Sequence, residues 1–226
     1  MNKFLFSLLF SSTVFGASLS ESFPAGKGAN YSVKMGKDVE PVHLGLYIAG
    51  TRVDSVHVEY FMETKGLLPV QMWQQFEIVV KEKGPAEIKK GFVFTKEMKK
   101  PEIMPDNFLK GASGGIQMND FLFADKSALE KYKIGVETIE IAAGTTKATH
   151  YRTTNNGQTV DYWISDEAKP MGLVMLTSKS DKVESQNYSL EMKSLIQNVK
   201  PRILPENAGP LTEQGKKFLA KPESMR

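Results

Sequence analysis

The chain has 226 residues, of which 24% are charged and 41% hydrophobic, and its formal net charge at pH 7 is +3. So small a positive excess does not indicate a nucleic-acid-binding protein. The sequence contains no cysteine, which excludes disulfides, thiolate metal sites and acylation on a lipoprotein cysteine.

The first 18 residues have the layout of an export signal. Lys3 supplies a positive charge, and Phe4 to Phe15 form a mostly apolar run. That run is too short for a membrane-spanning helix, which needs about 20 residues. Small residues follow, so we expect a signal peptide over residues 1–18 that is cleaved near Gly16–Ser18. No later segment is apolar enough to predict a transmembrane span.

Most of the chain after the signal alternates with a period of two residues. Val56, Val58, Tyr60 and Met62 alternate with polar neighbours, which predicts a strand with one apolar face. Further strands are predicted at residues 76–80, 92–94, 136–141, 147–152, 159–165, 173–178 and 187–193. Short strands joined by turn residues, without strand–helix alternation, predict a mainly β fold. The expected fold is a strongly curved antiparallel sheet or open β-barrel with one or two short helices.

Lysines gather in the predicted hairpin around residues 76–100. They are interspersed with glutamates, and they comprise Lys81, Lys83, Lys89, Lys90, Lys96, Lys99 and Lys100. One interpretation is a solvated hairpin whose lysines protect a sheet edge from pairing with other chains. The other is a basic patch that contacts an anionic envelope surface.

Helix signals are few. Residues 105–109 predict a single turn. Ser127 and Glu130 fit a capping box, which predicts a helix of about two turns ending near Gly135. Residues 111–115 are glycine-rich and are interpreted as a flexible connector.

The composition changes at Pro201, where prolines and charges replace the alternation. We therefore expect one antiparallel β domain over residues 19–200 and a polar tail over residues 201–226. Residues 212–220 form either a short amphipathic helix, with Phe218 and Leu219 against the body, or part of a mobile tail.

Residues 144–176 predict a hairpin followed by a third strand. Asn156-Gly157 fits a type I′ turn, which requires positive φ. In the second strand Tyr162 points to one face and Trp163 to the other, so both faces carry an aromatic ring. Such a sheet is either covered on both faces or lines a cavity on one. We expect Trp163 to be a core residue.

A resemblance to known proteins is carried by this region. Its residues are Gly144-Thr145, Ala148, Tyr151, Tyr162-Trp163-Ile164-Ser165 and Pro170-Met171-Gly172-Leu173-Val174. Over residues 134–199 they resemble a group of uncharacterised periplasmic β-proteins with a G-T…W-V-S…P-x-G-L-V pattern. Those proteins are similar in outline to the open β-barrels of the LolA/LolB lipoprotein carriers. The resemblance implies a periplasmic location and a curved antiparallel sheet with a hydrophobic concave face.

Candidate catalytic groups are sparse. His43, His57 and His150 are far apart in sequence, and none has a partner at helical metal-ligand spacing. His57 and Glu59 share a strand face and could supply two ligands, but we prefer to interpret that face as a polar outer face. Ser165, Asp166 and His150 are hydrolase residue types, yet no G-x-S-x-G elbow accompanies them. We expect no enzymatic activity, no cofactor and no metal.

Two functions fit these observations. The first is a non-catalytic envelope protein that holds a lipid or a lipoprotein acyl chain in a half-open β-barrel. The expected lining is Tyr60, Met62, Phe76, Phe92, Phe94, Tyr162, Trp163 and Met175. The second is an envelope structural or interaction protein with a dry core, which contacts partners through the lysine-rich hairpin and the sheet edges.

Overall fold

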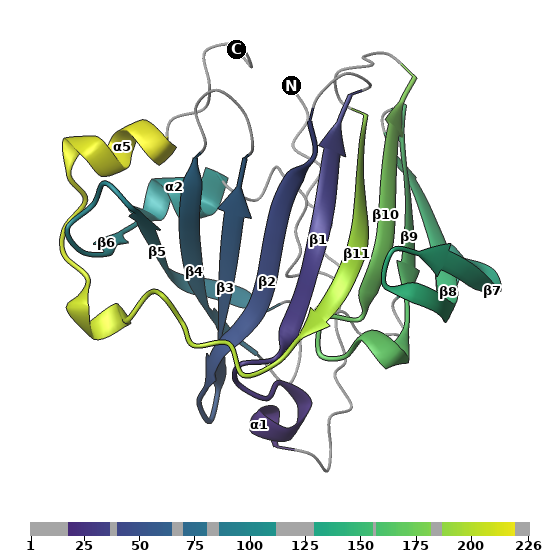
Figure 1. The fold of residues 1–226 in the computed structure, drawn as a ribbon, viewed down its shortest axis with the longest axis horizontal. Helices are drawn as coiled ribbons and strands as arrows, with labels where there is room; N and C mark the ends of the chain where they lie inside the picture. The colour runs from purple at the N-terminus through teal and green to yellow at the C-terminus, as the bar shows by residue number, and fades with distance from the viewer. Residues whose placement is uncertain are drawn as a thin grey trace.

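The computed structural model describes residues 18–36, 40–64, 70–80, 86–111, 129–155, 157–181 and 187–219. Eleven strands form one sheet in the order β6-β5-β4-β3-β2-β1-β11-β10-β9-β8-β7 (Figure 1). Every neighbouring pair is antiparallel. The end strands β6 and β7 do not pair with each other in the described chain, so the sheet is open. The predicted mainly β, antiparallel fold is confirmed.

The strands are β1 Gly28–Met35, β2 Val42–Thr51, β3 Ser55–Glu63, β4 Gln71–Val79, β5 Glu87–Thr95, β6 Glu102–Ile103, β7 Lys133–Ile141, β8 Gly144–Asn155, β9 Gln158–Ile164, β10 Leu173–Ser180 and β11 Tyr188–Ile196. The alternation predicted eight of them and missed β1, β2 and β6. β1 begins at Gly28, where an added Cβ would lie 2.1 Å from the Leu46 carbonyl oxygen. Only glycine fits that approach, yet in a sequence glycine suggests a turn.

The sheet consists of two antiparallel meanders, β1 to β6 and β7 to β11, in each of which consecutive strands are neighbours. β1 pairs with both β2 and β11, so the first and last strands lie side by side in the middle. The predicted hairpin between β8 and β9 is present: Asn155 pairs with Gln158, and Gly157 has φ of 78°. Asn156, the other turn residue, lies outside the described residues.

The described helices are short: α1 Leu19–Ser22, α2 Asp106–Gly111 and α5 Glu213–Leu219. The described residues also form three 3-10 turns: η2 Glu130–Tyr132, η3 Asp166–Ala168 and η5 Pro205–Asn207. α2 and α5 lie where short helices were expected, whereas α1 was not predicted. The helix expected to reach Gly135 is wrong at its C-terminal end, because residues from Lys133 onward pair with β8. Its start, and the connector after Gly111, lie outside the described residues.

Strand register assigns each side chain to one of two faces. We call the face that carries Glu59 the front face and the opposite one, which carries Val58, the back face. The back face holds the largest set of buried apolar side chains, among them Ala29, Tyr31, Leu46, Ile48, Val58, Phe76, Leu176 and Leu190. The core therefore lies mainly behind the sheet.

Part of the front face is covered by the C-terminal strap, residues 200–212, which crosses β2, β3 and β4 (Figure 1). Glu59 is 0% exposed and accepts the backbone N–H groups of Arg202 at 2.8 Å and Ile203 at 3.0 Å. Gln75 donates to Glu59 and to the Ile203 carbonyl oxygen. His57 is also buried, at 7% exposure. The interpretation of His57 and Glu59 as a polar outer face is thus wrong, because the strap excludes water there.

Beyond the strap, the chain stays against the sheet as far as α5. The backbone N–H and hydroxyl of Thr212 both donate to the Glu102 carboxylate. Phe218 and Leu219 pack against the core, as expected for an amphipathic helix.

Candidate functional site

The eight residues predicted to line a cavity are divided equally between the two faces. Register places Tyr60, Met62, Phe76 and Tyr162 on the back face. It places Phe92, Phe94, Trp163 and Met175 on the front face. The structure therefore brings together two groups of four rather than one lining of eight.

On the back face, a half-buried apolar strip crosses the ends of β2, β3 and β4. Leu44 pairs with Met62, which pairs with Met72. Tyr60 lies beside them, with its ring 5.5 Å from that of Phe76 in an edge-to-face contact. Leu44, Tyr60, Met62 and Met72 are partly exposed, whereas Val58 further along β3 is fully buried. We call these four residues the back-face strip.

On the front face, the two predicted phenylalanines lie beneath the strap. Phe92 and Phe94 are 4% and 8% exposed. The Arg202 guanidinium lies 5.1 Å from the Phe94 ring centroid and 5.8 Å from that of Trp73. This corner is filled by the chain's own strap and is part of the core.

At the other end of the front face the sheet curls over itself. The turn of the β7–β8 hairpin reaches β11, where the Ala142 N–H donates to Glu191 at 2.7 Å. β8, β9 and β10 separate β7 from β11 in the sheet, so this contact requires strong curvature. Trp163 and Met175 lie on the face that is turned inward, and both are half-buried.

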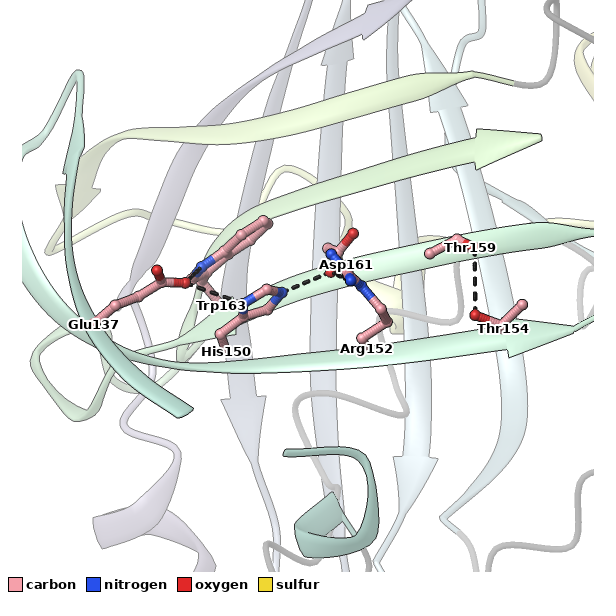
Figure 2. Close-up of polar contacts among 7 residues, drawn as sticks. All are labelled: Glu137, His150, Arg152, Thr154, Thr159, Asp161 and Trp163. Carbon is pink, nitrogen blue, oxygen red and sulfur yellow. Dashed lines mark hydrogen bonds and ion pairs between the residues drawn. The ribbon is translucent and has the colours of Figure 1, made fainter. Parts of the chain in front are cut away.

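A polar network surrounds Trp163 (Figure 2). Its ring stacks on His150, with centroids 4.4 Å apart, and its Nε1–H donates to Glu137. His150 lies between two carboxylates, with Nε2 2.6 Å from Asp161 and Nδ1 3.1 Å from Glu137. Carboxylate oxygens only accept, so each contact is a hydrogen bond when the ring nitrogen that faces it carries a proton.

Asp161 is the most enclosed member of this network and also accepts from Arg152 Nε at 2.7 Å. Burial raises the pKa of the Asp161 carboxyl, but the hydrogen bonds and charges of Arg152 and His150 outweigh it and hold this pKa below its ordinary value. The carboxylate is thus kept ionised. The arrangement joins β7, β8 and β9 through side chains.

Ser165 forms a separate set of hydrogen bonds. Its hydroxyl donates to the Lys147 carbonyl oxygen at 2.8 Å and lies 3.1 Å from Thr146 Oγ1. Within the described chain, no hydrogen bond joins it to His150, whose ring nitrogens face Asp161 and Glu137. Ser165, His150 and Asp166 are therefore not arranged as a nucleophile, base and orienting acid.

Next to this hairpin lies a pocket of about 390 Å³. Its wall includes Val136 of β7, Tyr151 of β8 and Ile164 of β9. Three carboxylates, Glu130, Asp166 and Glu167, and one lysine, Lys147, also line it. The sequence offered no signal for this pocket, because its walls come from three strands, β7, β8 and β9, and from η2 and η3, which only the folded chain brings together.

Five of the seven lysines of the predicted basic patch are described, and all five are exposed: Lys89, Lys90, Lys96, Lys99 and Lys100. Lys81 and Lys83 lie outside the described residues. The Lys100 side chain lies against Gly209 of the strap, where an added Cβ would meet its Cε at 2.4 Å.

The described residues contain no group of three or more His, Cys, Asp or Glu side chains placed to hold a metal ion. None of their helices has both the length and the apolar character needed to cross a membrane.

Fold and site together define an open, curved, antiparallel β-sheet protein with a C-terminal strap. Comparison of the sequence with models of known protein families finds no match, and no curated protein matches it significantly.

Proposed function

We propose that this chain is an exported envelope protein that binds an apolar, lipid-like ligand without catalysing a reaction. The ligand lies along the back-face strip, at the end of the sheet where apolar side chains remain partly exposed. The supporting observation is the contiguity of Leu44, Met62 and Met72 on three adjacent strands, with Tyr60 beside them. When a ligand removes apolar surface of this kind from water, the binding free energy becomes more favourable by about 25 cal/mol per Å².

The fold supports a carrier of this general shape. An open sheet leaves one end accessible, and methionines provide flexible side chains that adapt to an acyl chain. We also propose that residues 134–199 resemble periplasmic β-proteins and, through them, the LolA/LolB carriers. A lipid-binding function agrees with that resemblance.

Native mass spectrometry after incubation with palmitic acid or phosphatidylglycerol vesicles tests the proposal. We expect a bound lipid on the wild-type protein and reduced occupancy on Met62→Gln. The matched control is Glu63→Gln, which creates the same residue one position along β3 on the opposite face. Absence of bound lipid on the wild type, or equal occupancy in both variants, would contradict the proposal.

Export is part of the same proposal and has its own test. Cleavage after Gly16 would keep Ser18 in the mature chain. The backbone N–H of Ser18 donates to the Glu21 carboxylate at the start of α1, so this contact would be retained. Protein recovered from the periplasm of a Gram-negative host should have an intact mass that begins at Ala17. The full-length mass in the cytoplasmic fraction would contradict export.

The second candidate is an interaction protein that uses its exposed lysines. It is favoured by the five exposed lysines around β5. Changing Lys89, Lys90 and Lys99 to Glu, and leaving Lys100 because it packs on Gly209, should abolish binding to anionic vesicles. The control carries Glu at three exposed lysines elsewhere, Lys27, Lys179 and Lys217. Equal binding of the two triple variants would remove the patch from consideration.

A further inference from the structure

Among the described residues, none forms a strand along the outer edge of β7. β7 is the last strand of the sheet, and within the described chain only β8 pairs with it. In Figure 1 it forms the right-hand edge. An end strand presents unpaired backbone N–H and C=O groups, which are a template for another strand.

Two apolar side chains near the start of β7 face solvent. Ile134 is 59% exposed and Val136 is 53% exposed; Ile134 lies within the register shift between Lys133 and Gly135, and Val136 follows it. Edge strands that avoid pairing carry proline, inward-pointing charges or large bulges. β7 contains no proline, and its register shift is confined to the first residues, between Lys133 and Gly135. Its one inward-pointing charge is Glu137, which is paired with His150. The edge from Val136 onward is regular.

The pocket lies directly beside this edge. Val136 pairs with Thr149, which pairs with Ile164, and all three line the pocket. A strand added to β7 would therefore carry one of its side chains next to Val136, at the pocket. Edge pairing supplies affinity and an adjacent pocket supplies selectivity in peptide recognition of this type.

The charge of the pocket indicates which side chain it would accept. Glu130, Asp166 and Glu167 contribute three carboxylates and Lys147 one ammonium. Lys133 lies 3.1 Å from Glu130 and Lys169 3.5 Å from Asp166, in exposed ion pairs weak enough for a bound cation to displace. Its apolar lining residues are Val136, Ala148, Tyr151 and Ile164. A long side chain with an apolar stem and a cationic end, lysine or arginine, matches both features.

We propose that β7 binds an extended peptide as an additional strand, with a lysine or arginine side chain of that peptide in the adjoining pocket. This site is distinct from the back-face strip and goes beyond lipid binding. A negative result in the peptide-binding test would leave the proposed lipid binding intact, and the reverse also holds.

Four pools of nine-residue synthetic peptides test the proposal. Each pool is random except for a central Lys, Arg, Glu or Leu, and binding to the purified protein is measured by fluorescence anisotropy. We expect the Lys and Arg pools to bind at least about fivefold more tightly than the Glu pool, as a few weak charge contacts allow. Hydrogen exchange of the β7 amides should slow when the Lys pool is added.

Two variants locate the site. Val136→Lys should abolish binding, while the control Val53→Lys, at a residue 98% exposed in the β2–β3 turn, should leave it unchanged. Both changes are at exposed positions, and thermal melts verify that both variants fold. A double change, Glu130→Lys with Asp166→Lys, should reverse the preference toward the Glu pool.

Several results would overturn the proposal. One is equal binding of all pools with no protection of β7. Another is unchanged binding by Val136→Lys. A third is a concentration-dependent dimer that Val136→Lys abolishes, without peptide binding, which would assign the edge to a second copy of this chain.

Discussion

At the scale of single residues, the most consequential side chain is the buried carboxylate of Glu59. It accepts from Tyr47 Oη, Gln75 Nε2 and two backbone N–H groups of the strap. A glutamine there would keep the shape but present an amide NH₂ to groups that donate. We expect Glu59→Gln to lower the free energy of unfolding by about 2–4 kcal/mol.

A denaturant melt measures this loss, and hydrogen exchange at residues 202–203 locates it. The control is Glu213→Gln, where the side chain is 84% exposed and pairs with Lys216 at the surface. That variant should be within about 0.5 kcal/mol of the wild type. Equal stability of both variants would show that Glu59 does not anchor the strap.

Asp161 gives the protein a component of pH-dependent stability. Its pKa in the folded protein lies below the ordinary value of 3.8, so the folded state binds this proton less readily than the unfolded state. The resulting stabilisation is present above pH 3.8 and is lost as the pH falls through the folded pKa. We expect Asp161→Asn to be destabilised by about 1–2 kcal/mol at pH 7.

Melts of the wild type and Asp161→Asn from pH 7 down to pH 2 check the sign. The difference between them should be largest at pH 7 and should shrink below about pH 4, within the window set by the lowered pKa. A difference that grows as the pH falls would contradict the role given to Arg152 and His150.

Trp163 is half-buried rather than fully enclosed, so its truncation should cost less than that of a fully buried tryptophan. The ring stacks on His150 and donates to Glu137. We expect Trp163→Ala to lower the free energy of unfolding by about 2 kcal/mol, compared with about 3–5 kcal/mol for a fully buried tryptophan. Trp163→Phe, which keeps a ring without the N–H donor, should lose about half as much. A denaturant melt of Trp163→Ala that overlies the wild type would contradict this.

At the scale of elements, the strap behaves as an additional layer of the front face. Ending the chain at Lys200 would remove the fully buried Ile203 and leave Glu59 without two donors. We expect a loss of about 5 kcal/mol or more, enough to prevent folding of many domains. Ending it at Thr212 keeps these contacts and those to Glu102, and should cost about 1–2 kcal/mol for the half-buried Phe218 and Leu219.

Circular dichroism melts of the two truncated chains distinguish these cases. A chain ending at Lys200 that melts like the chain ending at Thr212 would show that residues 201–212 contribute little.

The sequence predicted strands correctly where apolar and polar residues alternate. Prediction failed where a glycine interrupts the alternation, and where a distant segment buries polar residues. β3 and the β8–β9 hairpin follow from their alternation and from the turn at Gly157. β1 and β2 were missed because Gly28 and Gly45 interrupt the apolar pattern. The burial of His57 and Glu59 could not be predicted, since it depends on a strap about 140 residues away in the chain.

At the scale of the whole molecule, the sequence predicted the fold class more fully than the site. Alternation fixes which residues of one strand share a face, such as Tyr60 with Met62. It does not fix which faces of distant strands coincide, so Phe92 and Trp163 were grouped with Tyr60 although they lie on the opposite side. Register across all eleven strands is needed to separate them.

The proposed lipid-like ligand on the back-face strip can be located by photocross-linking. Palmitate carrying a diazirine is cross-linked to the protein by light, and peptide mass spectrometry then identifies the modified residues. We expect adducts on Leu44, Tyr60, Met62 or Met72, with few on Phe61 and Trp73 of the front face. Adducts concentrated on Phe61 and Trp73, or none above a non-photolysed control, would contradict it.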